Sequence, residues 1–127
     1  MASYKYEHLH ITSTDPEKTA EFYTRFMGAK FVKEAEVLGM KMIDMELGGI
    51  IFRISRGTGA DANWTGTRFG LHHHGIQVDN LDKIIADLRA NNVEFVVEPF
   101  EPVPGVSAIF VKAPDNVLIE VIEKKES

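Results

Sequence analysis

An internal repeat is the feature that most constrains the fold of this chain. Residues 7–11 alternate polar and apolar side chains, and an Asp-Pro pair then opens a helical pattern that ends at Gly28. The second half contains a similar alternating run followed by "DNLDKIIADLRANN". Asp15 and Asp79, which we expect to cap the two helices, lie 64 residues apart (79 minus 15). Both halves therefore predict one strand, one helix and three further strands.

The apolar periodicity gives expected bounds for these elements. Each helix should bury one apolar face, made by Phe22, Tyr23, Phe26 and Met27 in the first half and by Leu81, Ile84, Ile85 and Leu88 in the second. The later strands are expected over 31–37, 40–47 and 50–55, and over 93–100, 105–113 and 116–124.

The predicted fold class is α+β, with two tandem βαβββ units forming a cupped, mixed eight-stranded sheet. The units span residues 4–55 and 71–124 of one domain that covers residues 1–127. Residues 56–70, rich in Gly and Thr, form a linker that can also act as a lid.

Composition excludes several classes of function. The net charge of -5 is spread along the chain without a basic stripe, which argues against a nucleic-acid partner. No apolar run approaches the roughly 20 residues of a membrane helix, and the first residues do not resemble a targeting signal, so we expect a cytoplasmic protein. Because the chain has no cysteine, any metal must be held by histidine and carboxylate.

Strand alternation sorts the candidate site residues by face. In the first strand Leu9 and Ile11 should pack on the helix, which sends His8 and His10 to the opposite, concave face. The same reasoning places five side chains of the other strands on the concave face, namely Arg53, Ser55, His73, Gln77 and Glu120. His72 and His74 are then solvated neighbours, although a shift of one residue in strand register would make His74 the inward histidine.

A pseudo-twofold relation between the halves would pair His8 with His73, and Arg53 with Glu120, on the floor of the cup. Two imidazoles and one carboxylate suit a divalent Fe, Mn, Ni, Co or Zn ion and leave coordination positions open for a substrate. Arg53 cannot bind a metal, but it can bind a substrate carboxylate or phosphate. An internal ion pair, for example with Glu120, is the alternative for this arginine.

Three segments, "HLHITSTDPEKTAEFYTRFMGAKF", "HGIQVDNLD" and "APDNVLIEVIE", resemble the vicinal oxygen chelate superfamily. This group includes glyoxalase I, methylmalonyl-CoA epimerase, fosfomycin resistance enzymes, bleomycin-binding proteins and extradiol dioxygenases. The resemblance implies that the four metal-binding positions fall on His8, Arg53, His73 and Glu120. Glyoxalase I usually carries a glutamate where this chain has Arg53, so three of the four positions match.

The resemblance implies a metal-dependent lyase or isomerase that stabilises an enediolate-type charge on a small oxygenated, anionic substrate. We expect His8, His73 and Glu120 to hold the metal, and Glu120 or His10 to move the proton. A role for His10 as a hydrogen-bonding support of the metal ligands is the alternative. Arg53, Gln77 and Trp64 are the expected substrate-binding residues, and Trp64 is equally suited to a dimer contact.

Two other functions remain open. An iron-dependent extradiol-type dioxygenase would use the same three ligands, whereas a metal-free binding protein of the bleomycin-resistance type would use the cup without turnover. The exposed edges of the predicted sheet favour a homodimer.

Overall fold

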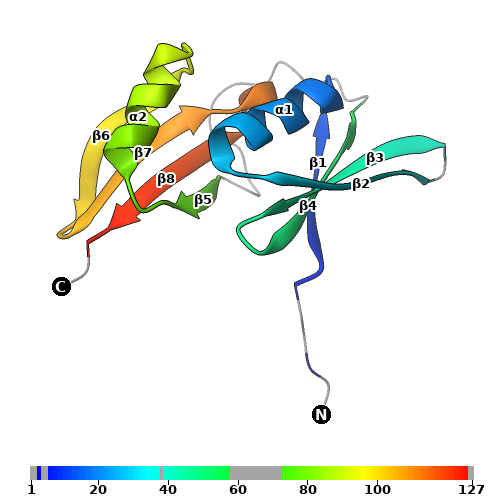
Figure 1. Cartoon of the computed structure of the whole chain (residues 1–127), viewed down its shortest axis with the longest axis horizontal. Coiled ribbons are helices and arrows are strands. Elements are labelled where there is room, and N and C mark those ends of the chain that lie inside the picture. The colour runs from blue at the N-terminus through cyan, green and yellow to red at the C-terminus, as the bar shows by residue number, and fades with distance from the viewer. Residues whose placement is uncertain (1–2, 4–5, 38, 58–72, 126–127) are drawn as a thin grey trace. The chain divides into compact units, whose positions relative to one another are not determined.

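The computed structural model describes residue 3 and residues 6–37, 39–57 and 73–125. The chain divides into two compact units, Met1–Ala62 and Asn63–Ser127. Each unit has the predicted order of one strand, one helix and three strands, which confirms the α+β class and the tandem βαβββ plan (Figure 1). The eight strands form two four-stranded sheets, one in each unit.

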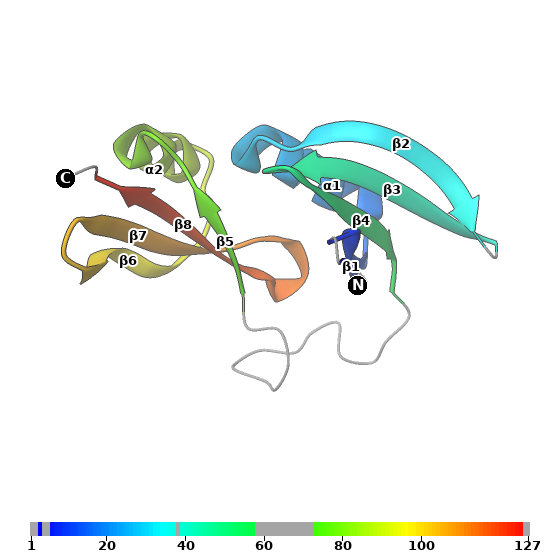
Figure 2. The same ribbon diagram turned by 90° about the horizontal axis from the view of Figure 1, so that it is seen from below.

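Unit 1 is a mixed sheet with the strand order β1-β4-β3-β2. The first strand pairs with the fourth in parallel. Strands β2, β3 and β4 form antiparallel hairpins, which Figure 2 shows side by side. Its elements are β1 (His8–Ser13), α1 (Pro16–Met27), β2 (Lys30–Val37), β3 (Met40–Leu47) and β4 (Ile50–Arg56).

Local sequence determines both ends of α1. The Asp15 side chain accepts a hydrogen bond from the Lys18 amide at 3.3 Å, and Pro16 occupies the first turn. The helix ends at Gly28, whose φ of 72° is the left-handed conformation that glycine adopts most easily. Both predicted caps of this helix are confirmed.

The core of unit 1 lies between α1 and one face of the sheet. Tyr23 of α1 packs against Phe52 of β4 with ring centroids 4.5 Å apart, and both side chains are fully buried. Met27 is buried as predicted, whereas Phe22 and Phe26 remain partly exposed. The packing of Phe52 on the helix fixes which face of β4 points away from it.

The turn between β3 and β4 sets the register of this hairpin. Gly48 and Gly49 both have positive φ angles, 60° and 94°, as a tight two-residue hairpin turn requires. The resulting register pairs Asp44 directly with Arg53.

Unit 2 repeats the plan with the strand order β5-β8-β7-β6, and β5 runs parallel to β8. Leu81 and Leu88 of its helix are buried, as are Ile119 and Val121 on the facing strand. Its elements are β5 (His74–Gln77), α2 (Leu81–Ala90), β6 (Phe95–Val103), β7 (Val106–Lys112), a 3-10 turn (Pro114–Asn116) and β8 (Leu118–Lys124).

The predicted cap of α2 is wrong by one residue. Asn80, not Asp79, is the N-cap, and its side chain accepts a hydrogen bond from the Lys83 amide at 3.1 Å. A carboxylate from β8 also serves this end of the helix, because Glu123 accepts a hydrogen bond from the Leu81 amide at 2.7 Å. Asp and Asn are both favourable N-cap residues, so residue type alone does not predict which of these two neighbours caps the helix.

Most of the predicted linker or lid, including Trp64, lies outside the described residues. None of the helices in the described ranges is long and apolar enough to cross a membrane.

Candidate functional site

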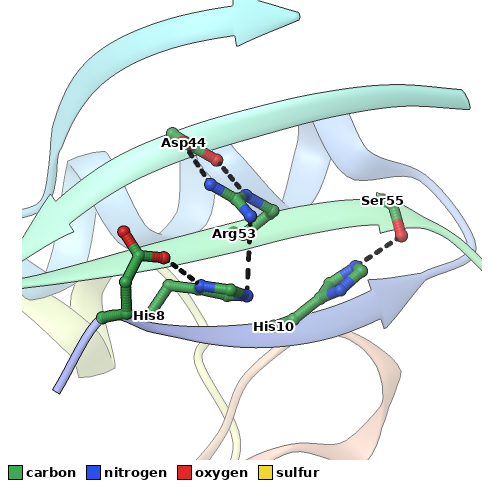
Figure 3. Close-up of polar contacts among 6 residues, drawn as sticks. His8, His10, Asp44, Arg53 and Ser55 are labelled. Atoms are coloured by element: carbon green, nitrogen blue, oxygen red, sulfur yellow. Dashed lines mark hydrogen bonds and ion pairs between the residues drawn. The ribbon is translucent and has the colours of Figure 1, made fainter. Parts of the chain in front are cut away.

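One face of the unit 1 sheet gathers polar side chains from three neighbouring strands. Phe52 and Ile54 of β4 are fully buried on the helix side, so Arg53 and Ser55 project from the opposite face. His8 and His10 project from β1 on that same side, as predicted (Figure 3). The expected alternation therefore holds for both strands.

Arg53 forms a bidentate ion pair with Asp44 of β3. Its Nε and Nη2 atoms lie 2.7 and 3.0 Å from the two carboxylate oxygens. Asp44 is only 4% exposed, and the hydrogen bonds from Arg53 hold its pKa below the usual range. Arg53 therefore has an internal ion pair, and its partner is Asp44, not the Glu120 suggested from the sequence.

His8 has a charged neighbour at each ring nitrogen. Its Nδ1 lies 2.5 Å from Oε1 of Glu7, and its Nε2 lies 3.5 Å from Nη1 of Arg53 (Figure 3). A carboxylate only accepts hydrogen bonds, so the proton belongs on Nδ1 and the lone pair on Nε2. The Nε2 atom of His8 is therefore the ring nitrogen placed to accept a hydrogen bond from Arg53 or to bind a cation.

His10 lies two residues along the same strand and contacts Ser55. Its Nε2 atom is 2.7 Å from the Ser55 hydroxyl, which is almost completely buried. Partial burial lowers the pKa of His10 below its ordinary value, and the positive charge of Arg53 lowers it further. At neutral pH this ring is therefore an uncharged base fixed at one nitrogen.

Strand pairing in unit 2 separates His73 from His74. His74 and Ile76 stand beside Ile119 and Val121, which are fully buried. The alternate residues of β5 share the face of Glu120, the pairing partner of Gly75. Burial lowers the pKa of His74, and the nearby His73 lowers it further. His74 thus belongs to the helix side of the sheet.

His73 lies against Glu120. Its Nε2 atom is 3.3 Å from Oε1 of Glu120, and its ring meets the ring of Phe110 edge to face with centroids 4.9 Å apart. Two ligands at about 2.1 Å from one ion stand roughly 3.0 to 3.4 Å apart at ordinary coordination angles. The spacing and the chemistry of this donor pair therefore fit a divalent metal.

The predicted metal ligands are divided between the two units. Within the ranges that the structure describes, no three His, Asp or Glu side chains form a ready metal site. His73 and Glu120 form a donor pair in unit 2, whereas His8 belongs to unit 1. Gln77 is exposed on the Glu120 face of β5.

Sequence reasoning missed three contributors to these contacts: Asp44, Glu7 and Phe110. Alternation in β3 contained a signal for Asp44, because Ile43, Met45 and Leu47 mark the helix side and leave Asp44 on the other face. Similar reasoning in β7 would have found Phe110, which pairs with Glu120. Glu7 precedes β1, and only its side-chain conformation brings it to His8.

Comparison with known proteins identifies the family. The model of the Glyoxalase/Bleomycin resistance protein/Dioxygenase superfamily matches residues 5–121. The chain belongs to this superfamily. The resemblance noted from the sequence, the vicinal oxygen chelate group, is therefore confirmed.

Relatives in this superfamily have different activities. A lactoylglutathione lyase of Arabidopsis thaliana, GLX1, is 27% identical over 94% of this chain, which spans only 44% of that protein. The human mitochondrial methylmalonyl-CoA epimerase is 30% identical over 90% of this chain and 70% of its own length. The crystal structure of FosX from Listeria monocytogenes, a fosfomycin resistance protein, matches with a TM-score of 0.73 at 18% identity, covering 98% of this chain and 95% of FosX. That structural likeness shows the fold.

Proposed function

We propose that the protein is a metal-dependent enzyme of the glyoxalase-like class, a lyase or isomerase that acts on a small oxygenated, anionic substrate. The observation that carries this proposal is the 3.3 Å contact between His73 Nε2 and Glu120 Oε1 on one face of the unit 2 sheet. Membership of the superfamily and the lyase and epimerase names of two relatives support an enzymatic role.

In this proposal His8, His73 and Glu120 hold a divalent ion of Fe, Mn, Ni, Co or Zn. Such an ion supplies a Lewis acid for negative charge that develops on vicinal oxygens of the substrate. FosX of Listeria monocytogenes was crystallised with Mn(II), and that relative shares the fold. The three side chains offer two imidazole nitrogens and one carboxylate, a donor set that these ions accept.

His10 and Glu120 are the residues proposed to move the proton. The lowered pKa of His10 keeps its ring in the neutral form that can accept a proton at neutral pH. Ser55 holds Nε2 of His10 at 2.7 Å, so proton exchange with a substrate takes place at the other nitrogen, Nδ1. The Glu120 side chain is 22% exposed, which allows a substrate to reach its carboxylate.

Arg53 and Gln77 are proposed to orient the substrate. An arginine has five N–H donors, and the contacts of Arg53 with Asp44 and His8 use three of them. The remaining two can bind an acidic group, and Asp44 fixes the plane in which they lie. Gln77 offers an exposed amide on the Glu120 face. A lid role for Trp64 stays a prediction.

Elemental analysis of purified, untagged protein tests the metal site. We expect about one divalent ion per chain in the wild type, and its loss in His73→Ala and in Glu120→Ala. His74→Ala is the matched control, because it removes the next imidazole along the chain from the opposite face of β5. Loss of metal in His74→Ala with retention in His73→Ala would contradict the assignment.

A metal-free binding protein is the second candidate, and the proximity of Arg53 to His8 favours it. This function predicts a wild type that stays empty after metal supplementation and binds aromatic ligands without turnover. An extradiol dioxygenase would instead contain iron and consume oxygen in the presence of a catechol, so oxygen uptake separates it from a lyase.

We also propose that the protein forms a homodimer. The outer strands β2 and β6 carry exposed apolar side chains, including Phe31, Val32, Val96 and Val97, which a second copy can cover. Light scattering coupled to size-exclusion chromatography tests this proposal, and a monomer mass at micromolar concentration would contradict it.

A further inference from the structure

A continuous chain of polar contacts crosses the face of the unit 1 sheet. Asp44 holds the Arg53 guanidinium in a bidentate ion pair, Arg53 reaches Nε2 of His8, and Nδ1 of His8 contacts Glu7 (Figure 3). The groups along this chain follow in the order carboxylate, guanidinium, imidazole and carboxylate. Each group therefore has a hydrogen-bond or ion-pair partner in the group next to it.

The contact at His8 involves the nitrogen that a metal would need. With the proton of His8 on Nδ1, its only lone pair in the ring plane is on Nε2. The Nη1 atom of Arg53 lies 3.5 Å from that nitrogen and can point an N–H at it. A cation bound at Nε2 must take the place of this N–H.

Asp44 keeps the guanidinium where it is. The carboxylate is 4% exposed and engages two nitrogens of Arg53, so a rotation of the guanidinium away from His8 would strain or break a buried ion pair. An arginine stays protonated at any working pH, and its positive charge also opposes a second cation nearby. Asp44 is thus a positioning residue that acts through Arg53.

We propose that Arg53, held by Asp44, competes with a divalent cation for Nε2 of His8 and so weakens metal loading of this protein. This inference rests on the proposed metal-binding role of His8. It implies that binding of the ion is coupled to movement of the Arg53 guanidinium. It also implies that an arginine at this position, where glyoxalase I usually carries a glutamate, lowers the affinity for the metal as well as the number of metal ligands.

The decisive variant is the double substitution Asp44→Asn with Arg53→Gln. It replaces the ion pair by two amides that can hydrogen-bond to each other, leaves no buried charge unpaired and keeps the net charge unchanged. The matched control is Arg89→Gln with Glu98→Gln, which removes another arginine-carboxylate pair, 2.7 Å long and exposed, in unit 2.

Metal-free protein is titrated with Co²⁺, and binding is measured by calorimetry and by the visible absorption of the bound ion. We expect the double variant at positions 44 and 53 to bind Co²⁺ at least tenfold more tightly than the wild type. The control pair should match the wild type. Equal affinity of the wild type and the double variant would overturn the inference while leaving the proposed metal site intact.

Absence of Co²⁺ binding in both proteins would overturn the inference together with the proposed metal-dependent function. A second measurement needs no variant. In nitrogen-15 spectra of the wild type titrated with Zn²⁺, the His8 Nε2 signal and the Arg53 side-chain signals should change together. A shift of His8 Nε2 with unchanged Arg53 signals would contradict the competition.

Discussion

The Asp44 and Arg53 pair predicts an unequal cost for its two single substitutions. Asp44 is almost fully buried, whereas the Arg53 side chain is 26% exposed and can turn towards water. Arg53→Met would therefore leave a buried carboxylate without its cation. Asp44→Asn would leave an arginine that can still be hydrated and can still donate one hydrogen bond to the amide.

The size of the effect follows from the geometry of the pair. Unit charges about 4 Å apart attract each other by about 4 kcal/mol at an effective dielectric constant of about 20. Loss of one partner of a buried pair costs about 3 to 5 kcal/mol, and partial exposure of Arg53 places this case at the lower end. We expect Arg53→Met to lower the free energy of unfolding by about 3 kcal/mol, and Asp44→Asn by about 1 kcal/mol.

The pH dependence has a definite sign. The pKa of Asp44 in the folded protein is depressed, so the stabilisation from the pair is complete above the unfolded value of about 3.9 and is lost as pH falls through the folded value. In Arg53→Met, burial without the arginine raises the pKa of the carboxyl, and protonation relieves its cost. The difference between wild type and variant should therefore begin to shrink above about pH 4, as pH falls through the raised pKa of the variant, and should shrink further below about pH 4, where the wild type loses the pair.

Urea unfolding of the metal-free proteins, followed by circular dichroism between pH 3.5 and 7.5, measures both effects. The neutral double variant, Asp44→Asn with Arg53→Gln, serves as the control, because its stability should lie above that of Arg53→Met and should not gain on acidification. Equal losses for the two single variants, or a difference that stays constant down to pH 3.5, would refute this account of the pair.

Three further predictions concern unit 2. Asn80→Ala should lower the free energy of unfolding by about 1 kcal/mol, whereas Asp79→Ala should change it little, as measured by urea unfolding. The depressed pKa of His74 predicts that stability of the metal-free protein falls as pH drops below the unfolded value of about 6.5, and His74→Phe should flatten a stability curve measured across that range. Gly75→Ala should fold and keep its metal in elemental analysis, because the added Cβ meets Oε1 of Glu120 at 3.9 Å, whereas Gly75→Leu should fold and lose metal.

The sequence predicted which face of the sheet each side chain occupies better than it predicted which side chains contact each other on that face. Alternation alone assigned Arg53 to the face opposite the helix and separated His73 from His74, because a period of two residues changes the face of every neighbour. The fully buried Phe52, Ile119 and Val121 agree with that assignment. A face is a local property, so a single strand is enough to predict it.

The partner of Arg53 is a property of two strands. Asp44 meets Arg53 only because the Gly48–Gly49 turn sets the β3 and β4 register. The sequence alone does not show which carboxylate pairs with this arginine, since Coulomb attraction makes Glu120 and Asp44 equally suitable. A related difficulty displaced the α2 cap from Asp79 to Asn80, because two adjacent residues offered the same hydrogen bond.

The parallel pairing in each unit has a consequence for the order in which the protein folds. Strands β2 to β4 and β6 to β8 are joined by short hairpins, but β1 and β5 must close loops of about 43 and 45 residues to meet their partners (51 minus 8 and 119 minus 74). Such distant pairs form late, after the local hairpins exist. His8 lies on β1 and His73 directly precedes β5, so each of the two histidine ligands proposed belongs to the strand of its unit that pairs last. During synthesis, each of these histidines therefore reaches its folded position only after nearly the whole of its unit has been made.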